Sequence, residues 1–429
     1  MGIGSDNNGV SAVLTSKSKK ILAHTYYCYP FKTEDPLKWC NNIIALINDL
    51  PKIVRKNIVA ISINHTQGSF LEYSDNQEAL LTNDLSFVNR DDLMQSQVRQ
   101  PLLLTDNIIT FSEGDLTQIL RFLNNQNYHD CSEQYLLRRK ADWLMSWLLG
   151  NLRWAEESNN LDWGWNIKEE DWIGWTSAKS WISSLPNIVS SGTIVGPIST
   201  KRALMLGLPH GCLVIAGTSN DNAGIIATPS NQTDGITILN NRLSLNCFIE
   251  TPFYSNGVVS YRLGHSWVGR GVSRAGTSIL KYLFSYEIIN DLSRQINPNI
   301  PSGLHYYPLV SQGEVFPISK REMAPIIEPR PISDSLYLHG LLEGLANIED
   351  IAWKKMQKIR LSKMKRVITM GHGANNSSWR LLRQRILNSK VSNRSSSVPA
   401  TGLALLALNG FYRTLKSNQM IEKPLEKSL

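Results

Sequence analysis

The sequence predicts an α/β protein that is built from domains of similar design. The chain has 429 residues, 42% of them hydrophobic, which at about 100–200 residues per domain is enough for two or three domains. Short strand patterns alternate with helix patterns in the first third. Strands near residues 1–5 and 212–218 each run into a polar loop, so two domains with a boundary near residues 200–215 are expected.

The N-terminal stretch MGIGSDNNGVSAVL predicts a strand, a polar turn and a second strand. The turn, Asp6 to Gly9, contains residues that accept positive φ. It is compatible with a plain hairpin and also with a loop that binds phosphate. A further polar turn, KSKK, then leads into the strand ILAHTYYCY.

A helix is expected over DPLKWCNNIIALINDLP, with Asp35 as N-cap and Pro36 in the first turn. NIVAISIN then predicts a buried strand, and SFLEYSDNQEALL predicts a strand, a turn at Asp75–Asn76 and another strand. The resulting order, three strands, a helix and a strand, predicts a mixed sheet with a crossover helix.

Residues 143–181 contain eight of the twelve tryptophans. One interpretation is a helical subdomain that uses these side chains as its core. The other is a wall of indole rings on which a sugar stacks. The spacing does not decide between them.

The second half of the chain predicts alternating elements as well. CLVIAGT predicts a strand that runs into the loop SNDNAG at the start of a second domain. Several strands are expected over residues 236–268, and one long amphipathic helix over about 333–360. KRVITMGHGANNSSWRLLRQRIL predicts a strand, a turn and a helix whose N-terminus, at Asn375 to Ser377, offers free N–H groups to an anion. TGLALLALNGFY predicts a short final helix.

Composition limits the partners. The net charge of +8 permits anionic ligands, but Lys and Arg are scattered, so we expect nucleotides rather than nucleic acid. The five cysteines form no C-x-x-C pair, which argues against a zinc site or a disulfide framework and favours the cytoplasm. No run reaches the roughly 18 apolar residues of a membrane span, and we expect no membrane partner.

Several long segments resemble the FGGY carbohydrate kinases, most closely the D-ribulokinase branch of cyanobacteria and plastids. They are KADWLMSWLLGN, LPNIVSSGTIVGPI, SGLHYYPLVSQGEVFPI with EPRP, LHGLLEGLANIEDIAWKKMQ and GHGANNSSWRLLRQRIL. The resemblance implies two ribonuclease-H-like domains of the actin-like ATPase fold around a cleft. It implies a sugar-binding domain over residues 1–210 and an ATP-binding domain over residues 211–429, with ATP and Mg²⁺ as cofactors.

The resemblance also implies a sugar site, with changes at the positions of its carboxylates. The first-loop Asp of the family is Gly4 here, and Asp6, about 6.6 Å further along an extended strand, is the substitute metal ligand. The second loop matches Asn64 and Thr66. The catalytic Asp is Asn220, with Asp221 beside it as the candidate base, although neighbours in an extended chain point to opposite faces. Two more sugar-binding positions follow, at Glu156 and Asn159.

For the nucleotide, the matched positions lie in four glycine- or asparagine-rich stretches. The expected ATP- and phosphate-binding residues are Asp6, Asn7, Asn8, Asn241, Gly271, Gly276, Gly371, Gly373, Ala374 and Asn376. Two of these stretches contain arginines that the family pattern lacks, at Arg242, Arg270 and Arg274. Their side chains are interpreted either as phosphate ligands or as solvent-facing charges. His372, beside the ATP loop, is the one histidine expected to matter.

Two functions are compatible with this pattern. The first is ATP-dependent phosphorylation of a ketopentose such as D-ribulose, with activity weakened because an amide at Asn220 cannot act as a base. The second is an inactive relative that keeps the fold for ligand sensing or partner binding. Fold alone does not decide between them, because function depends on the site.

Overall fold

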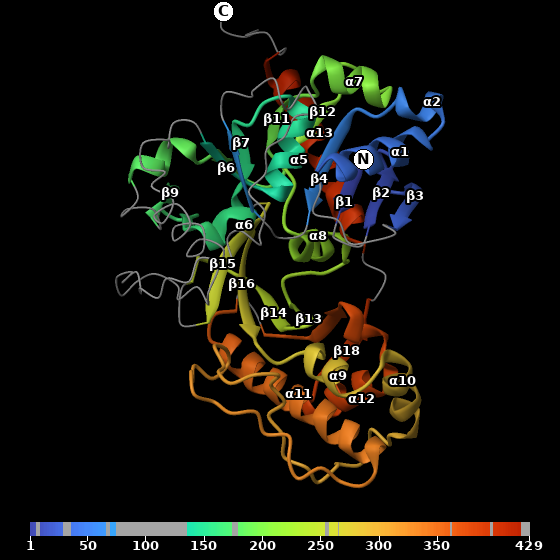
Figure 1. The fold of residues 1–429 in the computed structure, drawn as a ribbon, viewed down its shortest axis with the longest axis vertical. Coiled ribbons are helices and arrows are strands. Elements are labelled where there is room, and N and C mark those ends of the chain that lie inside the picture. The colour runs from blue at the N-terminus through green and yellow to red at the C-terminus, as the bar shows by residue number, and fades with distance from the viewer. Residues whose placement is uncertain are drawn as a thin grey trace, which may run out of the picture. The chain divides into compact units, whose positions relative to one another are not determined.

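The computed structural model describes residues 1–5, 9–28, 36–65, 69–73, 135–173, 179–253, 257–264, 266–360, 363–394 and 398–421. The chain divides into two compact units (Figure 1). The first unit comprises residues 1–227 and 398–429, and the second comprises residues 228–397. The domain boundary expected at 210/211 therefore differs from this division by 17 residues, and the C-terminal helix belongs to the first unit rather than the second.

The first unit contains a six-stranded sheet in the order β11-β12-β4-β1-β2-β3. β2 lies between β1 and β3 and is antiparallel to both, whereas β4 is parallel to β1 and β12 is parallel to β4. The expected order of three strands, a helix and a strand is therefore confirmed. The strands are β1 (Gly2–Ser5), β2 (Gly9–Thr15), β3 (Ile21–Cys28), β4 (Ala60–His65), β11 (Ile194–Pro197) and β12 (Leu213–Ile215).

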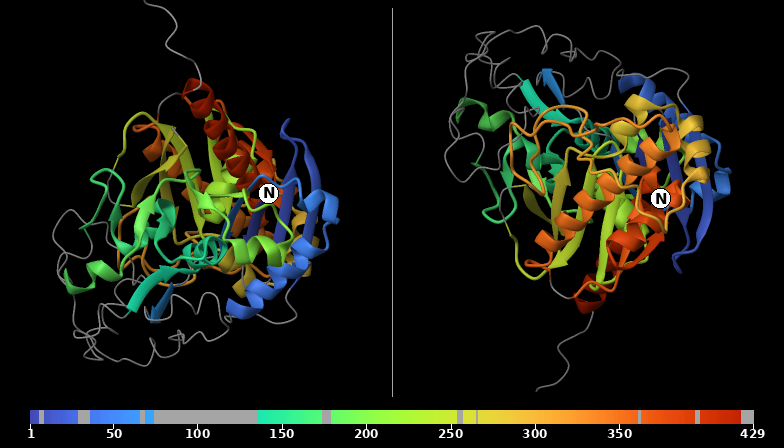
Figure 2. Two further views of the ribbon diagram at one scale, coloured as in Figure 1. Left: turned by 90° about the horizontal axis from the view of Figure 1, so that it is seen from above. Right: turned by 90° about the horizontal axis from the view of Figure 1, so that it is seen from below.

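Helices cover this sheet, and the last of them returns from the far end of the sequence. α13 (Pro399–Ile421) lies across β1, β2 and β4, where the red helix meets the blue strands in Figure 2. This contact is so close that a Cβ at Gly2 would lie 2.1 Å from the Ala404 nitrogen. The other helices are α1 (Pro36–Asn48), α2 (Lys52–Arg55), α5 (Lys140–Leu149), α6 (Glu157–Asn160), α7 (Thr200–Leu206) and α8 (Asn220–Ala227).

The tryptophan-rich segment is mostly a set of short elements rather than a helical subdomain. Trp143 and Trp147 on α5 are buried in the core of the first unit, and Trp163 is also buried. Trp165 and Trp172 are half-buried and meet edge to face, with ring centroids 5.3 Å apart. Core packing thus accounts for the first three. The short elements are β5 (Ser69–Tyr73), β6 (Tyr135–Arg139), β7 (Trp154–Glu156), β8 (Trp165–Asn166), β9 (Asp171–Trp172), β10 (Asn187–Val189) and the 3₁₀ turns Leu161–Trp163 and Lys179–Ser184.

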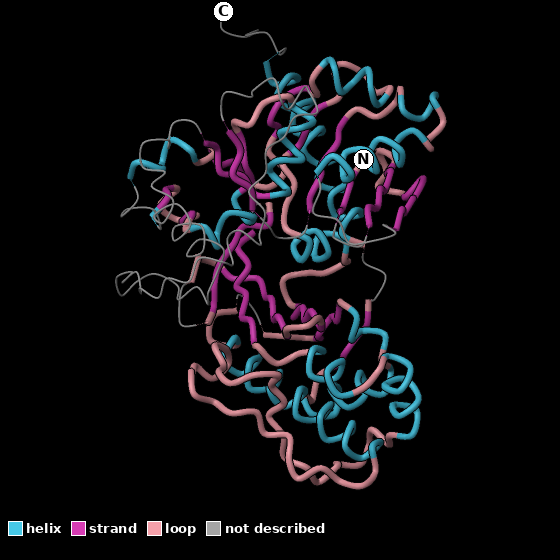
Figure 3. The backbone as a smooth tube through the Cα atoms, viewed as in Figure 1, coloured by secondary structure: helices cyan, strands magenta, loops and turns pink. Residues whose placement is uncertain are grey.

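The second unit shares five strands of this arrangement, because β16-β14-β13-β17-β18 corresponds to β3-β2-β1-β4-β12, and β15 is an additional edge strand beside β16. Its sheet runs β15-β16-β14-β13-β17-β18, with β13, β14 and β16 antiparallel and with β17 and β18 parallel to β13. The helices gather on one side of this sheet, as the cyan segments of Figure 3 show. The elements are β13 (Asp234–Leu239), β14 (Leu243–Ile249), β15 (Val258–Leu263), β16 (Ser266–Ser273), β17 (Arg366–Met370), β18 (Lys390–Asn393), α9 (Thr277–Leu283), α10 (Tyr286–Gln295), α11 (Asp334–Met356) and α12 (Ser377–Ile386).

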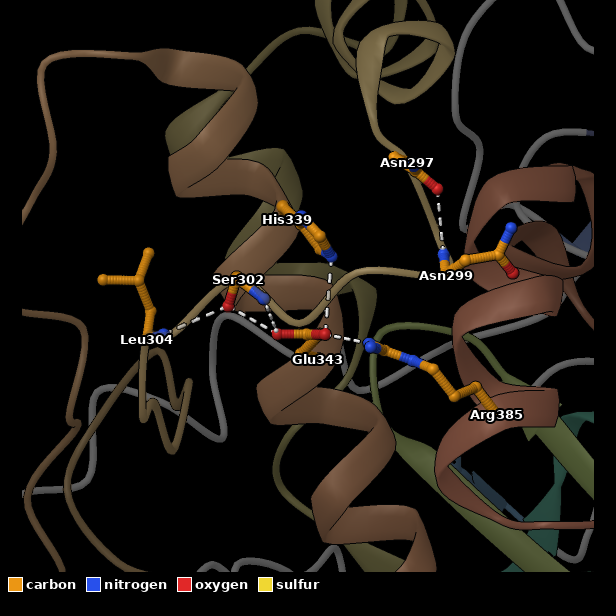
Figure 4. A network of polar contacts seen from close by, with 7 residues as sticks. All are labelled: Asn297, Asn299, Ser302, Leu304, His339, Glu343 and Arg385. Atoms are coloured by element: carbon orange, nitrogen blue, oxygen red, sulfur yellow. Dashed lines mark hydrogen bonds and ion pairs between the residues drawn. The ribbon is translucent and has the colours of Figure 1, made fainter.

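The long helix expected near 333–360 is α11, and Ser333 caps it by accepting a hydrogen bond from the Leu336 N–H. Its inner face packs into the apolar core of the second unit, and two buried carboxylates on it bind neighbouring elements. Glu343 accepts hydrogen bonds from the Ser302 N–H and hydroxyl and from Arg385 on α12 (Figure 4). Glu349 pairs with the buried Arg383, also on α12. These contacts fix α12, and with it the turn that precedes α12.

Two elements differ from their sequence-based interpretation. The strand in CLVIAGT is β12, which pairs with β4 inside the first sheet and therefore does not begin a second domain. The stretch SNDNAG is not a loop, because α8 begins at Asn220. The turn and second strand expected after Tyr73 lie outside the described residues, as do Asp35 and the turn residues Asp6, Asn7 and Asn8.

Candidate functional site

Three residues predicted for the sugar site come together in the first unit. Asn64, the penultimate residue of β4, is fully buried, and its Nδ2 donates a hydrogen bond to Oδ1 of Asn220 at 3.0 Å. The Oδ1 of Asn64 accepts a hydrogen bond from Nδ2 of Asn159 at 3.3 Å. The side chains of Asn159, Asn64 and Asn220 therefore form a chain of amides across α6, β4 and α8. Thr66, the other residue expected in the second loop, lies outside the described residues.

The start of α8 changes the relation between Asn220 and Asp221. In an extended chain, neighbouring side chains point to opposite faces, which is the relation expected for these two residues from the sequence. In a helix, successive side chains are about 100° apart, and the two residues occupy the first turn of α8. Asn220 is the one that contacts Asn64, while Asp221 is half-buried beside it. The amide, rather than the carboxylate, therefore occupies the centre of this group.

Glu156 lies next to Asn159 but directs its carboxylate into the protein. It is the N-cap of α6 and is 1% exposed. Burial, together with the neighbouring Glu157 carboxylate, raises the pKa of Glu156 to about 8. Its carboxylate accepts hydrogen bonds from the Ser158 N–H and hydroxyl, the Asn159 N–H and the Ser191 hydroxyl. The predicted sugar ligand is thus occupied by protein donors.

A group of hydroxyls completes this region, and the sequence argument missed it. Thr218 Oγ1 is 3.1 Å from both Ser158 Oγ and Ser191 Oγ. Ser158 Oγ also accepts a hydrogen bond from the Ser219 N–H, one residue before α8. The hydroxyls therefore connect Glu156 to the start of α8. The sequence signals for this group are the segment LPNIVSSGTIVGPI, which contains Ser191, and the stretch CLVIAGT, which ends at Thr218.

The first hairpin runs beside these amides. β1 pairs in parallel with β4, and Gly4 is opposite Asn64 in that register. A Cβ at Gly4 would have its nearest neighbour, the Ala400 nitrogen, at 3.4 Å, which is ordinary contact. The backbone therefore leaves room for a side chain where this sequence has none.

In the second unit, three of the predicted nucleotide loops converge. The Asn240 carboxamide oxygen accepts a hydrogen bond from the His372 N–H and lies 3.1 Å from His372 Nδ1. The Asn240 carbonyl accepts from the Thr277 N–H, and the Asn241 carbonyl accepts from the Ser278 hydroxyl at 2.8 Å. The β13–β14 turn, the start of α9 and the turn after β17 thus form one cluster, here called the turn cluster.

Two predicted glycines are needed for this close approach. Gly371 has φ +84°, and a Cβ there would lie 2.7 Å from the Leu239 carbonyl oxygen. At Gly276, a Cβ would lie 2.4 Å from the Asn241 carbonyl oxygen. Asn241, Gly276 and Gly371 therefore belong to the turn cluster for reasons of packing alone. Thr277 fits a ligand better, because its buried Oγ1 has no hydrogen-bond partner among the described residues.

The remaining predicted nucleotide residues are placed differently. Gly373 packs on Leu239 and Trp379, and Ala374 is buried. The Asn376 side chain caps α12 by accepting from the Trp379 N–H at 2.8 Å, so it takes up an N–H group that was expected to face an anion. Gly271 lies apart from the turn cluster, in β16, where a Cβ would be 2.4 Å from the Phe316 ring.

Two of the three arginines in these loops have contacts within the protein, and the third, Arg242, is exposed. Arg270 stacks on the Tyr261 ring, with its guanidinium carbon 4.5 Å from the centroid, and its Nε donates to Asn246 at 2.7 Å. Arg274 donates its backbone N–H to Glu314, which also accepts from the Ser273 hydroxyl. Glu314 is a buried clamp on the segment that leads to Gly276, and the sequence argument missed it as well.

The described residues supply no ready set of metal ligands. No group of three or more His, Cys, Asp or Glu side chains among them is arranged to hold an ion. The predicted ligand Asp6 lies outside the described residues, so Mg²⁺ binding there stays a prediction. Within the same residues, no helix has a sufficiently long apolar stretch to cross a membrane.

The five-strand arrangement common to the two sheets and the helices on each sheet define the class of the molecule, two ribonuclease-H-like units of the actin-like ATPase fold. This fold is similar to that of several solved sugar kinases. The xylulose kinase from Rhodospirillum rubrum matches 96% of this chain and 89% of its own, with TM-score 0.75 and 16% identity. The xylulose kinase from Lactobacillus acidophilus matches 96% of this chain and 89% of its own, with TM-score 0.71 and 14% identity.

A third similar structure is the Plasmodium falciparum glycerol kinase with ADP. It matches 100% of this chain and 98% of its own, with TM-score 0.70 and 13% identity. No protein-family model matches the sequence. The expected fold is therefore confirmed. At sequence identities of 13–16%, the similarity shows the fold and not the activity.

Proposed function

We propose that this chain is a cytoplasmic sugar kinase of the FGGY type that transfers the γ-phosphoryl group of ATP to a ketopentose such as D-ribulose, at a reduced rate. The observation that carries this proposal is the amide chain of Asn159, Asn64 and Asn220. Amides both donate and accept hydrogen bonds, so the group suits the hydroxyls of a neutral sugar. This amide chain lies in a fold that is similar to those of solved xylulose kinases and a glycerol kinase.

The reaction needs a sugar hydroxyl oxygen to attack the γ-phosphorus while the bond to the β–γ bridging oxygen breaks. In this chain, Asn220 can orient the hydroxyl but cannot take its proton, because a carboxamide is not a base near neutral pH. The proton would leave to water or to a phosphate oxygen. Phosphoryl transfer depends mainly on positioning and electrostatics, so the loss of a base slows the reaction without abolishing it.

For the nucleotide, the turn cluster of the second unit is the proposed site. Its glycines bring three loops together, and Thr277 Oγ1 is a buried hydroxyl without a hydrogen-bond partner among the described residues. A phosphate oxygen or an adenosine hydroxyl would satisfy it. ATP bound there would supply the phosphoryl group, and Mg²⁺, if Asp6 holds it, would neutralise phosphate charge.

The alternative is an inactive relative that senses a ligand or binds a partner. Gly4, Asn64 and Asn220 all lack the carboxylate that the resemblance implies, which favours this reading. A coupled ADP-release assay with D-ribulose, D-xylulose and glycerol distinguishes the two. Turnover with one sugar, even well below the roughly 1–100 s⁻¹ of typical kinases, supports the kinase. No turnover, together with no thermal shift on adding Mg-ATP, supports the inactive relative.

A further inference from the structure

The carboxylate of Glu156 has no acceptor capacity left for a ligand. Oε1 accepts from the Ser158 N–H and the Ser191 hydroxyl, and Oε2 accepts from the Ser158 hydroxyl and the Asn159 N–H. The two oxygens of an ionised carboxylate offer about four lone-pair sites, and the protonated form offers fewer. All of them are used inside the protein, so a sugar hydroxyl could bind Glu156 only by breaking one of these contacts.

The same turn is also held from its other side. Asp142, buried on α5, accepts hydrogen bonds from the Glu156 N–H at 2.9 Å and from Asn160 Nδ2 at 2.8 Å. The short helix α6 has only four residues, too few to be stable by its own hydrogen bonds. Its conformation therefore depends on these two buried carboxylates, which bind the turn at residues 156, 158, 159 and 160.

We propose that Glu156 is a positioning residue of the sugar site rather than a sugar ligand. It fixes the backbone at Ser158 and Asn159, so that Asn159 Nδ2 reaches Asn64 and thereby orients Asn220. A second set of hydrogen bonds also connects Glu156 to the start of α8, because the Ser158 hydroxyl that binds Glu156 accepts a hydrogen bond from the Ser219 N–H. This inference rests on the proposed function, because it concerns the same sugar site.

The matched control is Glu157. It is as deeply buried as Glu156 and adjacent to it, but its carboxylate accepts from the Ser190 hydroxyl and has no hydrogen bond to Asn159 or Ser158. Glu156→Gln replaces one oxygen with an NH₂ group that accepts no hydrogen bond, so the backbone N–H of either Ser158 or Asn159 loses its acceptor, while the hydroxyl beside it can rotate to accept from the NH₂. Glu157→Gln makes the same chemical change on the neighbouring side chain.

The first test measures D-ribulose affinity by calorimetry, with unfolding midpoints as a check on folding. We expect at least a tenfold loss for Glu156→Gln, partial recovery in Glu156→Asp, and less than a twofold change for Glu157→Gln. Asn159→Ala should lower the affinity for D-ribulose by as much. Adding Glu156→Gln to Asn159→Ala should lower the affinity little further, because both substitutions act through one contact. Unchanged affinity in Glu156→Gln, or losses that simply add, would overturn the proposal.

The second test needs no sugar and separates the two proposals. Hydrogen exchange followed by mass spectrometry should show faster exchange in Glu156→Gln for peptides over residues 157–161 and 219–222, and no such change in Glu157→Gln. If the wild-type protein binds no sugar but this pattern appears, the sugar-kinase proposal fails and the positioning role stands. If exchange at 219–222 is unaffected, Glu156 does not reach α8 and the positioning role is wrong.

Discussion

The side-chain amide of Asn64 donates a hydrogen bond to the carboxamide oxygen of Asn220 across 3.0 Å, although the two residues are 156 positions apart in sequence. Both positions match carboxylates in the family that the sequence resembles. Two carboxylates this close would repel each other or share a proton. The two amides instead satisfy each other without charge, so the centre of the site is neutral at any pH near 7.

Restoring a base at the centre of the site should raise activity. Asn220→Asp keeps an oxygen for the Asn64 amide to bind and adds a group that can accept a proton. A general base contributes about 10²–10⁴-fold, so at least a tenfold gain in the ADP-release rate with D-ribulose is expected. Asn64→Asp is the control, because it removes the donor and should give no gain. An unchanged rate in Asn220→Asp would show that proton removal does not limit turnover.

Two buried carboxyls should make the protein less stable as the pH rises. Burial raises the pKa of Asp142 to about 6, although hydrogen bonds from the Glu156 N–H and Asn160 and the charges of Arg139 and Arg138 oppose the shift. Burial, together with the neighbouring Glu157 carboxylate, raises the pKa of Glu156 to about 8. The folded protein thus binds these protons more tightly than the unfolded chain. Their contribution to stability is full below the unfolded pKa values near 4 and is lost as pH rises through 6 and then 8.

Thermal unfolding midpoints between pH 5.5 and 9 test this expectation. The buried Met1 amino group, whose pKa burial lowers to about 6, acts in the opposite direction, as its folded form resists protonation. The comparison is therefore with Glu156→Gln, which removes one titration and leaves Met1 unchanged. The wild-type midpoint should fall more steeply than that of the variant between pH 5.5 and about 8, and the two slopes should converge at higher pH. Parallel curves would contradict the assignment.

Breaking the buried ion pair between α11 and α12 should strongly destabilise the second unit. The side chains of Arg383 and Glu349 are each 1% exposed, and Glu349 also accepts a hydrogen bond from Thr237. Arg383→Leu leaves a buried charge unpaired, which costs about 3–5 kcal/mol in unfolding free energy. Arg294→Ala, at the exposed pair with Asp291, should cost less than about 1 kcal/mol. Urea unfolding of both variants measures the difference, and similar values would refute the argument.

Gly271 should tolerate no side chain, although it was expected in a phosphate loop. An added Cβ would lie 2.4 Å from the Phe316 ring, so Gly271→Ala should cost about 1–3 kcal/mol of stability by overpacking. Gly211→Ala is the control, since a Cβ there meets nothing within 4 Å. Phe316→Leu in the same chain should recover part of the loss. A fully stable Gly271→Ala protein that loses only ATP binding would restore the phosphate-loop interpretation.

Local patterns were sufficient for most elements of the fold. Period-two and helical spacing, caps such as Ser333 and turn residues predicted β1 to β4, α1, α11 and the strand, turn and helix around Gly371. They failed where partners are remote. The stretch at Asn220 has the composition of a loop, yet it forms α8 and packs against α13, about 180 residues later. The domain boundary was placed too early for the same reason, because β12 looks like any short strand until it pairs with β4.

The candidate site divides along the same line. The sequence by itself determined the two similar units and the polar loops after their strands, because these follow from residue types and local periodicity. Its resemblance to the FGGY kinases, and no local pattern, implied that carboxylates are missing at Gly4, Asn64 and Asn220. Only the tertiary structure decided that Asn64, Asn159 and Asn220 bind one another and that Glu156 faces inward. Those facts depend on which side chains the sheet pairing and the burial of α6 bring within hydrogen-bond distance, and no local pattern encodes such distances.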